Sequence, residues 1–263
     1  MTVLEADIAQ RRLSSPACVA QDRHAGVLLT LADPVPWSAA WALQQRIHAE
    51  RLSGSRPDTL MLLEHLPVYT AGRRTKPVHL TPSGPSPNSR LIPVETVSRG
   101  GSITYHGPGQ LVAYPICKLS DHASGAKAYV HMLEEVLIRT LLHWNIHAYR
   151  MEKAPGVWTR HERCETKIAS IGARIDRGIT LHGFALNVST DLHPFSRIVP
   201  CGLDGCRMTS MTEVRQAPLA VALVAEQLAL AFSAVFHLEW ATIITGRLTT
   251  PSCVGQPAAA TKD

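Results

Sequence analysis

Residues 99–116 read RGGSITYHGPGQLVAYPI, with four glycines, a proline and a histidine directly in front of a strand pattern. An ordinary hairpin needs one or two turn residues, so this density exceeds what a chain reversal requires. Glycines without a Cβ let backbone N–H groups approach a ligand, Arg99 can hold a negative or polar group, and the neighbours of His106 would leave it exposed. The stretch therefore predicts either a ligand-binding loop or a wide structural loop with a solvent histidine.

Strand and helix patterns surround this stretch in an irregular order. Apolar or alternating runs predict strands over residues 27–32, 58–65, 91–98, 110–117, 156–160, 166–175 and 179–189. Apolar residues at helical spacing predict helices over residues 37–54, 127–144 and 219–232. Residues 71–90 have the composition of a long loop, and Asp-Arg-Gly at 176–178 suits a hairpin. Because no internal repeat divides the chain, the pattern predicts a single α+β domain.

The two ends of the chain differ in composition from the middle. Residues 1–24 are polar without a sustained period, which predicts a flexible N-terminal arm. Residues 246–263 are rich in Thr, Pro, Ala and Gly, which predicts a disordered tail. The catalytic or binding domain is therefore expected over residues 25–245.

Composition narrows the class of protein. A hydrophobic fraction of 45%, a charged fraction of 18% and a mean hydropathy of +0.02 are typical of a globular protein and not of a disordered one. No apolar run is long enough for a membrane span and the N-terminus lacks the layout of a secretory signal, so we expect a cytoplasmic protein whose six cysteines are thiols. The net charge of +5 comes from dispersed cations, which favours an acidic protein partner over a nucleic acid.

Lys167 begins an apolar strand pattern, ETKIASIGARI. Simple alternation places Lys167 on one face and Ser170 on the other, and a lysine in this position is usually an edge charge that reaches solvent. In a dry pocket it would instead favour its neutral form and could act as a base.

Cys201 lies in the segment RIVPCGLDGCRMTSM, between Pro200 and Gly202. Proline restricts the backbone before the cysteine, and glycine allows conformations after it that other residues rarely adopt. Successive backbone N–H groups could therefore lie near the sulfur and form an oxyanion site. The alternatives are a buried structural cysteine or a metal pair with Cys206. Zinc needs about four ligands and no matching Cys or His pair is present, so we expect no metal.

Taken together, these motifs resemble one family. The segments LLEHLPVYTAGRR, RGGSITYHGPGQLVAYPI, TKIASIGARI with LHGFALNVSTDL, and IVPCGLDG are similar, in the same order, to those of the octanoyltransferases, also called lipoate-protein ligase B. The resemblance extends from about residue 27 to residue 236. It implies the fold of lipoate- and biotin-protein ligases, a mixed β-sheet flanked by helices in one domain.

The resemblance also implies an activity, partners and site residues. The activity is transfer of an octanoyl group from acyl carrier protein to a lysine of lipoyl domains, in 2-oxoacid dehydrogenases and the glycine cleavage H protein, as the first step of protein lipoylation. Cys201 would be the nucleophile and Lys167 its base, without a cofactor, a nucleic acid or a membrane, and Arg73 and Arg74 would meet the carrier protein or its phosphate. The acyl pocket would be lined by Arg99 near its mouth and by Gly100, Gly101, Ser102, His106, Gly107, Tyr114, Ala169, Ser170, Ile171, Gly172, Gly183, Phe184 and Ala185.

Two other functions fit parts of the pattern. An ATP-dependent lipoate or biotin ligase would share the fold, but such enzymes use no cysteine nucleophile, so Cys201 favours transfer. A non-catalytic module that binds acyl carrier protein or lipoyl domains would need neither Cys201 nor Lys167. Dependence on ATP, or indifference to replacement of these two residues, would distinguish these alternatives.

Overall fold

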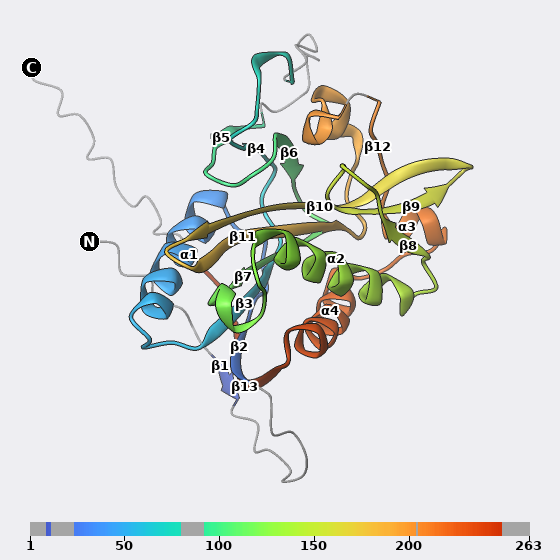
Figure 1. Ribbon diagram of the computed structural model, residues 1–263. Helices are drawn as coiled ribbons and strands as arrows, with labels where there is room; N and C mark the ends of the chain where they lie inside the picture. The colour runs from blue at the N-terminus through green and yellow to red at the C-terminus, as the bar shows by residue number, and fades with distance from the viewer. Residues whose placement is uncertain (1–8, 12–23, 80–91, 204, 249–263) are drawn as a thin grey trace, which may run out of the picture.

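The computed structural model describes residues 9–11, 24–79, 92–203 and 205–248 (Figure 1). Its strands are β1 (Ala9–Arg11), β2 (His24–Leu31), β3 (Asp58–Leu63), β4 (Val68–Ala71), β5 (Val94–Thr96), β6 (Ile103–His106), β7 (Gln110–Ile116), β8 (Ala148–Arg150), β9 (Val157–His161), β10 (Cys164–Asp176), β11 (Ile179–Asn187), β12 (Arg207–Met208) and β13 (Leu238–Gly246). Its α-helices are α1 (Trp37–Leu52), α2 (Ala126–Leu142), α3 (Met211–Arg215) and α4 (Val221–Phe236), and its 3₁₀ turns are η1 (Pro77–His79), η2 (Leu119–Asp121), η3 (His193–Arg197) and η4 (Pro200–Gly202).

Ten strands form one mixed sheet in the order β1-β13-β2-β3-β7-β11-β10-β9-β8, with β12 paired to β10. β2 runs parallel to β3 and to β13, whereas β7, β11, β10 and β9 are antiparallel to their neighbours along this path. Helices cover both faces of this sheet, so the α+β class with a mixed sheet and flanking helices is confirmed.

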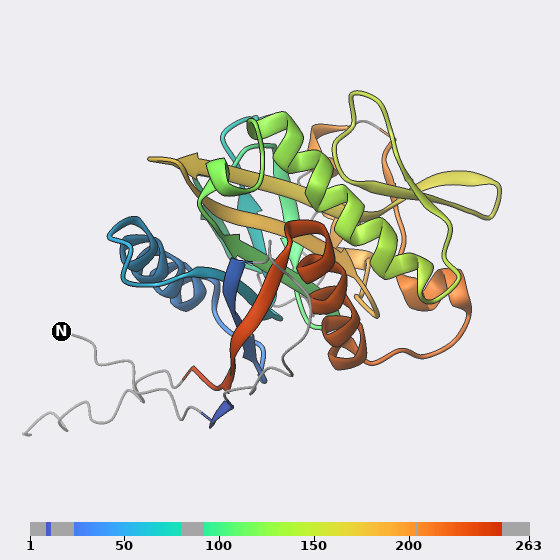
Figure 2. The ribbon, with the colours of Figure 1, turned by 60° about the horizontal axis from the view of Figure 1, so that its bottom comes forward.

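The central strand β7 shows why two cores form. Its side chains alternate: Leu111 and Ala113 pack with α2 and α4, whereas Val112 and Tyr114 pack with α1. Figure 2 shows α2 and α4 together, with α1 separate from them beyond the strands. Because both faces of β7 are covered, all seven of its residues are buried.

A second sheet has the order β5-β4-β6 and carries part of the opening stretch (Figure 1). The glycine-rich composition predicts a loop over residues 99–109, but residues 103–106 form strand β6, and all four are buried. Ile103 and Tyr105 pack with Phe195 and Ile198, which precede the Cys201 turn. The glycine-rich stretch is therefore a strand between two turns, and it supports the segment that carries the cysteine.

The helix predictions agree with the structure within a few residues. Pro36 caps the start of α1, and the chain leaves this helix at Ser53 and Gly54, where glycine adopts a φ of 78°. The helix predicted over 219–232 begins at Val221 and continues to Phe236, because the rings of Phe232 and Phe236 stack at 4.0 Å between centroids in the core.

The hairpin predicted at residues 176–178 is also confirmed. Asp176 pairs with Ile179, and the two loop residues Arg177 and Gly178 have φ values of 49° and 81°, as a tight type I′ turn requires. Strand β13, in contrast, was missed: it pairs in parallel with β2, more than 200 positions away, and local patterns do not predict such a partner.

The expected arm and tail lie mostly outside the described residues. Within residues 1–24, Ala9–Arg11 pairs with β13 as strand β1, and His24 begins β2. At the other end Gly246 is the last residue of β13. The division into arm, domain and tail stays a prediction.

Candidate active site

Cys201 lies at the centre of η4 in a left-handed conformation. Its φ and ψ are 59° and 8°, and Gly202 follows with a φ of 68°. A non-glycine residue in this region costs about 1–3 kcal/mol and is found mainly where surrounding structure holds it for a purpose. The Pro-Cys-Gly sequence therefore produces the local backbone strain typical of a functional residue.

Lys167 is almost completely buried, with 1% of its surface exposed. Its Nζ donates hydrogen bonds to the carbonyl of Pro155 at 2.8 Å and to Sγ of Cys201 at 3.3 Å, and it lies 5.3 Å from the ring centre of Trp158. The interpretation of Lys167 as an edge charge is therefore excluded. The amine and the thiol are close enough to exchange a proton directly.

Ser170 also contacts the cysteine, with Oγ at 3.6 Å from Sγ. The expected alternation, with Lys167 and Ser170 on opposite faces, is wrong because β10 contains a bulge. Lys167 pairs with Trp158 and Ala169 with Val157, so one residue of β10 has no counterpart on β9. This extra residue reverses the alternation and brings Lys167 and Ser170 to the same face.

The bulge also changes the predicted pocket lining. Ala169 turns into the helical core, where it is fully buried, and does not line the cavity beside Cys201. Gly107 does not line the cavity either, because it packs against the ring of Tyr105, and Gly100 lies in an adjoining cavity. These three positions are corrections to the predicted acyl pocket.

A cavity of about 300 Å³ opens beside the Cys201–Lys167 pair. The predicted residues that line it are Arg99, Gly101, Ser102, His106, Tyr114, Ser170, Ile171, Gly172, Gly183, Phe184 and Ala185. The cavity is also lined by residues outside the predicted pocket lining: Trp37, Thr70, Lys76, His79, Val112, Lys153, Pro155 and His182. Lys76 and His79 lie in the long loop-like segment that follows β4, and long loops within a compact domain are often functional, so the length of this segment could have indicated them.

Arg99 lines the cavity and braces the backbone around it. Its guanidinium donates to the carbonyls of Gly100, Ser102 and Thr70 and to the hydroxyl of Thr70, at 2.6–3.0 Å. Burial lowers its pKa, an effect that the nearby Cys201 and Tyr114 oppose. With its donors engaged, this side chain closes the turn around residues 99–102.

The expected oxyanion donors are engaged as well. The N–H of Gly202 donates to the carbonyl of Val199 at 3.0 Å, and the N–H of Leu203 donates to the carbonyl of Pro200 at 3.1 Å. Both bonds close the turn that holds Cys201. The interpretation of these successive N–H groups as an open oxyanion site is therefore wrong in this conformation.

His106 is buried, contrary to the expected exposure. Its Nδ1 lies 2.7 Å from Oε1 of Gln110 and its Nε2 lies 3.2 Å from the hydroxyl of Thr70. Nearby, Tyr114 donates its hydroxyl to Nε2 of His65 at 2.8 Å, since Nδ1 of His65 donates to the carbonyl of Val35. These groups form a polar layer beneath the cavity, and Tyr114 reaches the cavity from β7.

Acid is expected to destabilise the fold through three buried histidines. Burial lowers the pKa of His65 to about 4, that of His182 to about 3 and that of His106 well below its usual range. At pH values between these lowered pKa values and about 6.5, only the unfolded chain binds the protons. The free energy of unfolding is therefore highest above pH 6.5 and falls by up to about 1.4 kcal/mol per histidine for each pH unit below it. We expect urea unfolding at pH 5.5 to show a free energy of unfolding about 4 kcal/mol lower than at pH 7.5.

The exposed His131 provides the control for this titration. His131→Gln should leave the pH dependence unchanged, whereas His65→Gln should remove part of it. Equal stability of the unmodified protein at the two pH values would contradict the prediction.

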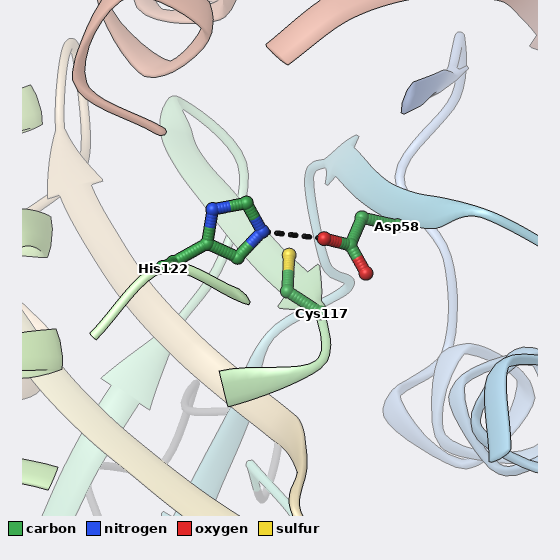
Figure 3. A group of neighbouring side chains, drawn as sticks. All are labelled: Asp58, Cys117 and His122. Carbon is green, nitrogen blue, oxygen red and sulfur yellow. Dashed lines mark hydrogen bonds and ion pairs between the residues drawn. The ribbon is translucent and has the colours of Figure 1, made fainter. Parts of the chain in front are cut away.

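A second group of reactive side chains lies where β3 begins and β7 ends (Figure 3). The side chains of Asp58, Cys117 and His122 converge, and their potential ligand atoms lie within 4.8 Å of one another. However, one oxygen of Asp58 accepts a hydrogen bond from Nε2 of His122 at 2.5 Å, and the other is bound by Arg51 and the N–H of Lys118. Because the carboxylate is already satisfied, we interpret this group as structural.

Removal of the Asp58 carboxylate is expected to destabilise the fold strongly. Burial raises the pKa of Asp58, but the bonds from His122, Arg51 and Lys118 outweigh it and hold the pKa below its usual value. Asp58→Asn should lower the free energy of unfolding by about 3–5 kcal/mol, because the buried His122 and the partly buried Arg51 lose the carboxylate that pairs with both of them. Asp121→Asn, which removes a more exposed partner of Arg51, should cost less than about 1 kcal/mol in the same urea titration. Similar decreases in the free energy of unfolding for the two variants would contradict the structural role of the Asp58 carboxylate.

Comparison with known proteins supports the family implied by the motifs. The family model of the lipoyl protein ligase A/B catalytic domain matches residues 36–233. An octanoyltransferase of Thermobifida fusca (strain YX) is 47% identical over 183 residues, covering 68% of this chain and 75% of that protein. This chain belongs to the octanoyltransferase family.

Other members of the octanoyltransferase family match over a larger share of their length. The octanoyltransferase of Chloroflexus aurantiacus (strain ATCC 29366 / DSM 635 / J-10-fl) is 44% identical over 207 residues, covering 78% of this chain and 92% of that protein. Among solved structures, the bipartite lipoate protein ligase of Thermoplasma acidophilum superposes with a TM-score of 0.59 at 16% identity, covering 82% of this chain and 86% of that one. The similarity to this solved structure confirms the expected fold of lipoate-protein ligases.

The part of the chain that the structure describes has no helix with both the length and the apolar character needed to cross a membrane.

Proposed function

We propose that this protein transfers an octanoyl group from acyl carrier protein to a lysine side chain of a lipoyl domain, through a thioester on Cys201. The observation that carries the proposal is the 3.3 Å contact between Nζ of Lys167 and Sγ of Cys201 beside a cavity. Membership of the octanoyltransferase family supports the same reaction.

The first half of the reaction forms the acyl-enzyme. Lys167 accepts the thiol proton, and the thiolate of Cys201 attacks the carbonyl carbon of the octanoyl thioester. As the new C–S bond forms, the pantetheine sulfur leaves and takes a proton from the Lys167 ammonium. One thioester replaces another, so the step is close to balanced and needs no ATP.

The second half releases the octanoyl group to the acceptor. The acceptor lysine must be neutral to attack, and Lys167, neutral again, removes its excess proton. The C–N bond of an amide forms, the C–S bond to Cys201 breaks, and the thiol is restored. The amide is more stable than the thioester, which favours the overall transfer.

The cavity provides a suitable environment for an acyl chain. Ile103, Val112, Phe184 and Ala185 contribute apolar surface, and the close approach of strands at Gly183 leaves no room for a Cβ. Each methylene buried there contributes about 0.8 kcal/mol to binding. Cavity depth can therefore select the chain length.

Basic residues around the cavity suit an acidic carrier protein. Arg74, Lys76 and Lys153 line the cavity itself, and an adjoining cavity is lined by Arg73 and Arg174. Cations at this position can hold the phosphate of a phosphopantetheine arm while its thioester reaches Cys201.

An ATP-dependent ligase remains the alternative, since a lipoate ligase shares the fold. The close amine–thiol pair favours transfer, because a ligase that forms an acyl-adenylate has no need for a nucleophilic cysteine. A binding module that only holds lipoyl domains would have no need for the pair either.

Intact-mass measurement after incubation with octanoyl-acyl carrier protein tests the proposal. We expect a gain of one octanoyl group that hydroxylamine releases, followed by its loss when a lipoyl domain is added. Modification of the lipoyl domain only with ATP and free octanoate, and no adduct on this protein, would favour the ligase.

A further inference from the structure

The proposed transfer places a negative charge on an oxygen atom beside Cys201. Attack by the thiolate moves the electron pair of the C=O bond onto this oxygen, and hydrogen-bond donors that meet it lower the barrier. The N–H groups of Gly202 and Leu203 both donate to carbonyls within the η4 turn. A side-chain N–H beside the cysteine turn would supply such a donor.

His79 lies beside the cysteine turn. Its carbonyl accepts a hydrogen bond from the N–H of Val199 at 2.9 Å, which joins η1 to the segment that precedes Cys201. A Cβ placed on Gly202 would lie 3.1 Å from Cε1 of His79, so the imidazole packs directly against the residue that follows the nucleophile. The ring also lines the same cavity as Cys201 and Lys167.

Two contacts determine which nitrogen of His79 carries the proton. Nδ1 accepts a hydrogen bond from the backbone N–H of Lys76 at 3.1 Å, and a backbone N–H can only donate. Nδ1 is therefore unprotonated, and the hydroxyl of Ser102, at 2.6 Å, must donate to it as well. The neutral ring carries its hydrogen on Nε2, for which the described residues offer no hydrogen-bond partner.

We propose that the Nε2–H of His79 donates a hydrogen bond to the oxyanion formed during octanoyl transfer, an inference that rests on the proposed function. His79 keeps its proton throughout: the oxyanion forms, accepts the hydrogen bond and collapses as the sulfur leaves. Lys76 and Ser102 act as positioning residues, because their bonds to Nδ1 fix the tautomer and orientation that make Nε2 the donor.

A pair of substitutions separates the donor from the packing of the ring. His79→Phe keeps a ring against Gly202 but has no N–H, whereas His79→Gln keeps an N–H near the position of Nε2. We expect the phenylalanine variant to lower kcat for acyl-enzyme formation about 10²–10³-fold with KM nearly unchanged. The glutamine variant should recover most of that loss, and His193→Phe, at an exposed histidine, should have no effect.

Alkylation of Cys201 by iodoacetamide provides the second measurement. This displacement forms no oxyanion, so His79→Phe should alkylate at nearly the rate of the unmodified protein although its acyl transfer has fallen. A parallel loss in alkylation would mean that His79 acts on the thiol or on the fold, and would overturn the assignment. Acylation within threefold of the unmodified protein would overturn it too.

The two proposals fail differently. If the unmodified protein gains no octanoyl group, the proposed function itself fails. If the unmodified protein is acylated and His79→Phe is acylated equally fast, only the role of His79 is wrong.

Discussion

Replacement of Cys201 with alanine is expected to lower octanoyl transfer on the order of 10⁶-fold, because the proposed covalent route then has no nucleophile. The stability of the variant should change little, since Cys201 is only partly buried and alanine removes a single sulfur atom. Single-turnover transfer from octanoyl-acyl carrier protein to a lipoyl domain measures the effect, with intact mass as the direct readout of the missing adduct.

Cys206 provides the matched control for this experiment, because it is a second thiol in the same segment. Burial raises its pKa to about 11, with a smaller opposing effect from Lys167, so its thiol stays protonated at neutral pH and is a poor nucleophile. Cys206→Ala should therefore keep both the adduct and the transfer. If the adduct survives in Cys201→Ala and disappears in Cys206→Ala, then Cys206 is the nucleophile and the assignment to Cys201 is wrong.

Replacement of Lys167 with methionine is the second large expected effect. Methionine keeps the length and the apolar stem, but it removes the amine that contacts Sγ at 3.3 Å and, in the proposed reaction, accepts the thiol proton and stabilises the thiolate. We expect acyl-enzyme formation to fall about 10²–10⁴-fold. Alkylation of Cys201 by iodoacetamide should fall as well, because it also requires the thiolate.

The joint loss of acylation and alkylation distinguishes Lys167 from His79, for which only acylation should fall. Lys127→Met, at an exposed lysine of α2, serves as the control and should change neither rate. Normal alkylation in Lys167→Met would show that Lys167 does not activate the thiol, and its role would then be limited to packing in β10.

The elements that the sequence predicted correctly depend on short-range patterns. Pro36 and Gly54 define α1, and the Arg177-Gly178 turn defines the hairpin between β10 and β11, because these signals act within a few residues of the structure they form. The motifs around Cys201 and Lys167 likewise indicated both residues, and the structure brings them together across 34 positions of sequence.

The elements that the sequence missed depend on long-range partners. Strand β13 needs β2, and β6 needs β4 and the residues before the cysteine turn, so neither has a local pattern sufficient to predict it. The buried state of His106 has the same cause in part, because Thr70, one of its two hydrogen-bond partners, lies 36 positions away in sequence.

The sequence by itself determined the class of fold, the family and the two residues of the amine–thiol pair, because these depend on residue type and order. Only the tertiary structure decided how the site is built. The bulge in β10 places Ser170 beside Lys167, the turn at η4 engages the N–H groups expected for an oxyanion, and His79 packs against Gly202 with its Nδ1 bound to the N–H of Lys76. The bulge depends on the register of β10 against β9, and the position of His79 depends on its contacts with Ser102 and Val199, which periodicity within one segment does not predict. The η4 bonds are local, but whether the N–H groups of a turn stay open or close the turn depends on its backbone conformation and not on residue type alone.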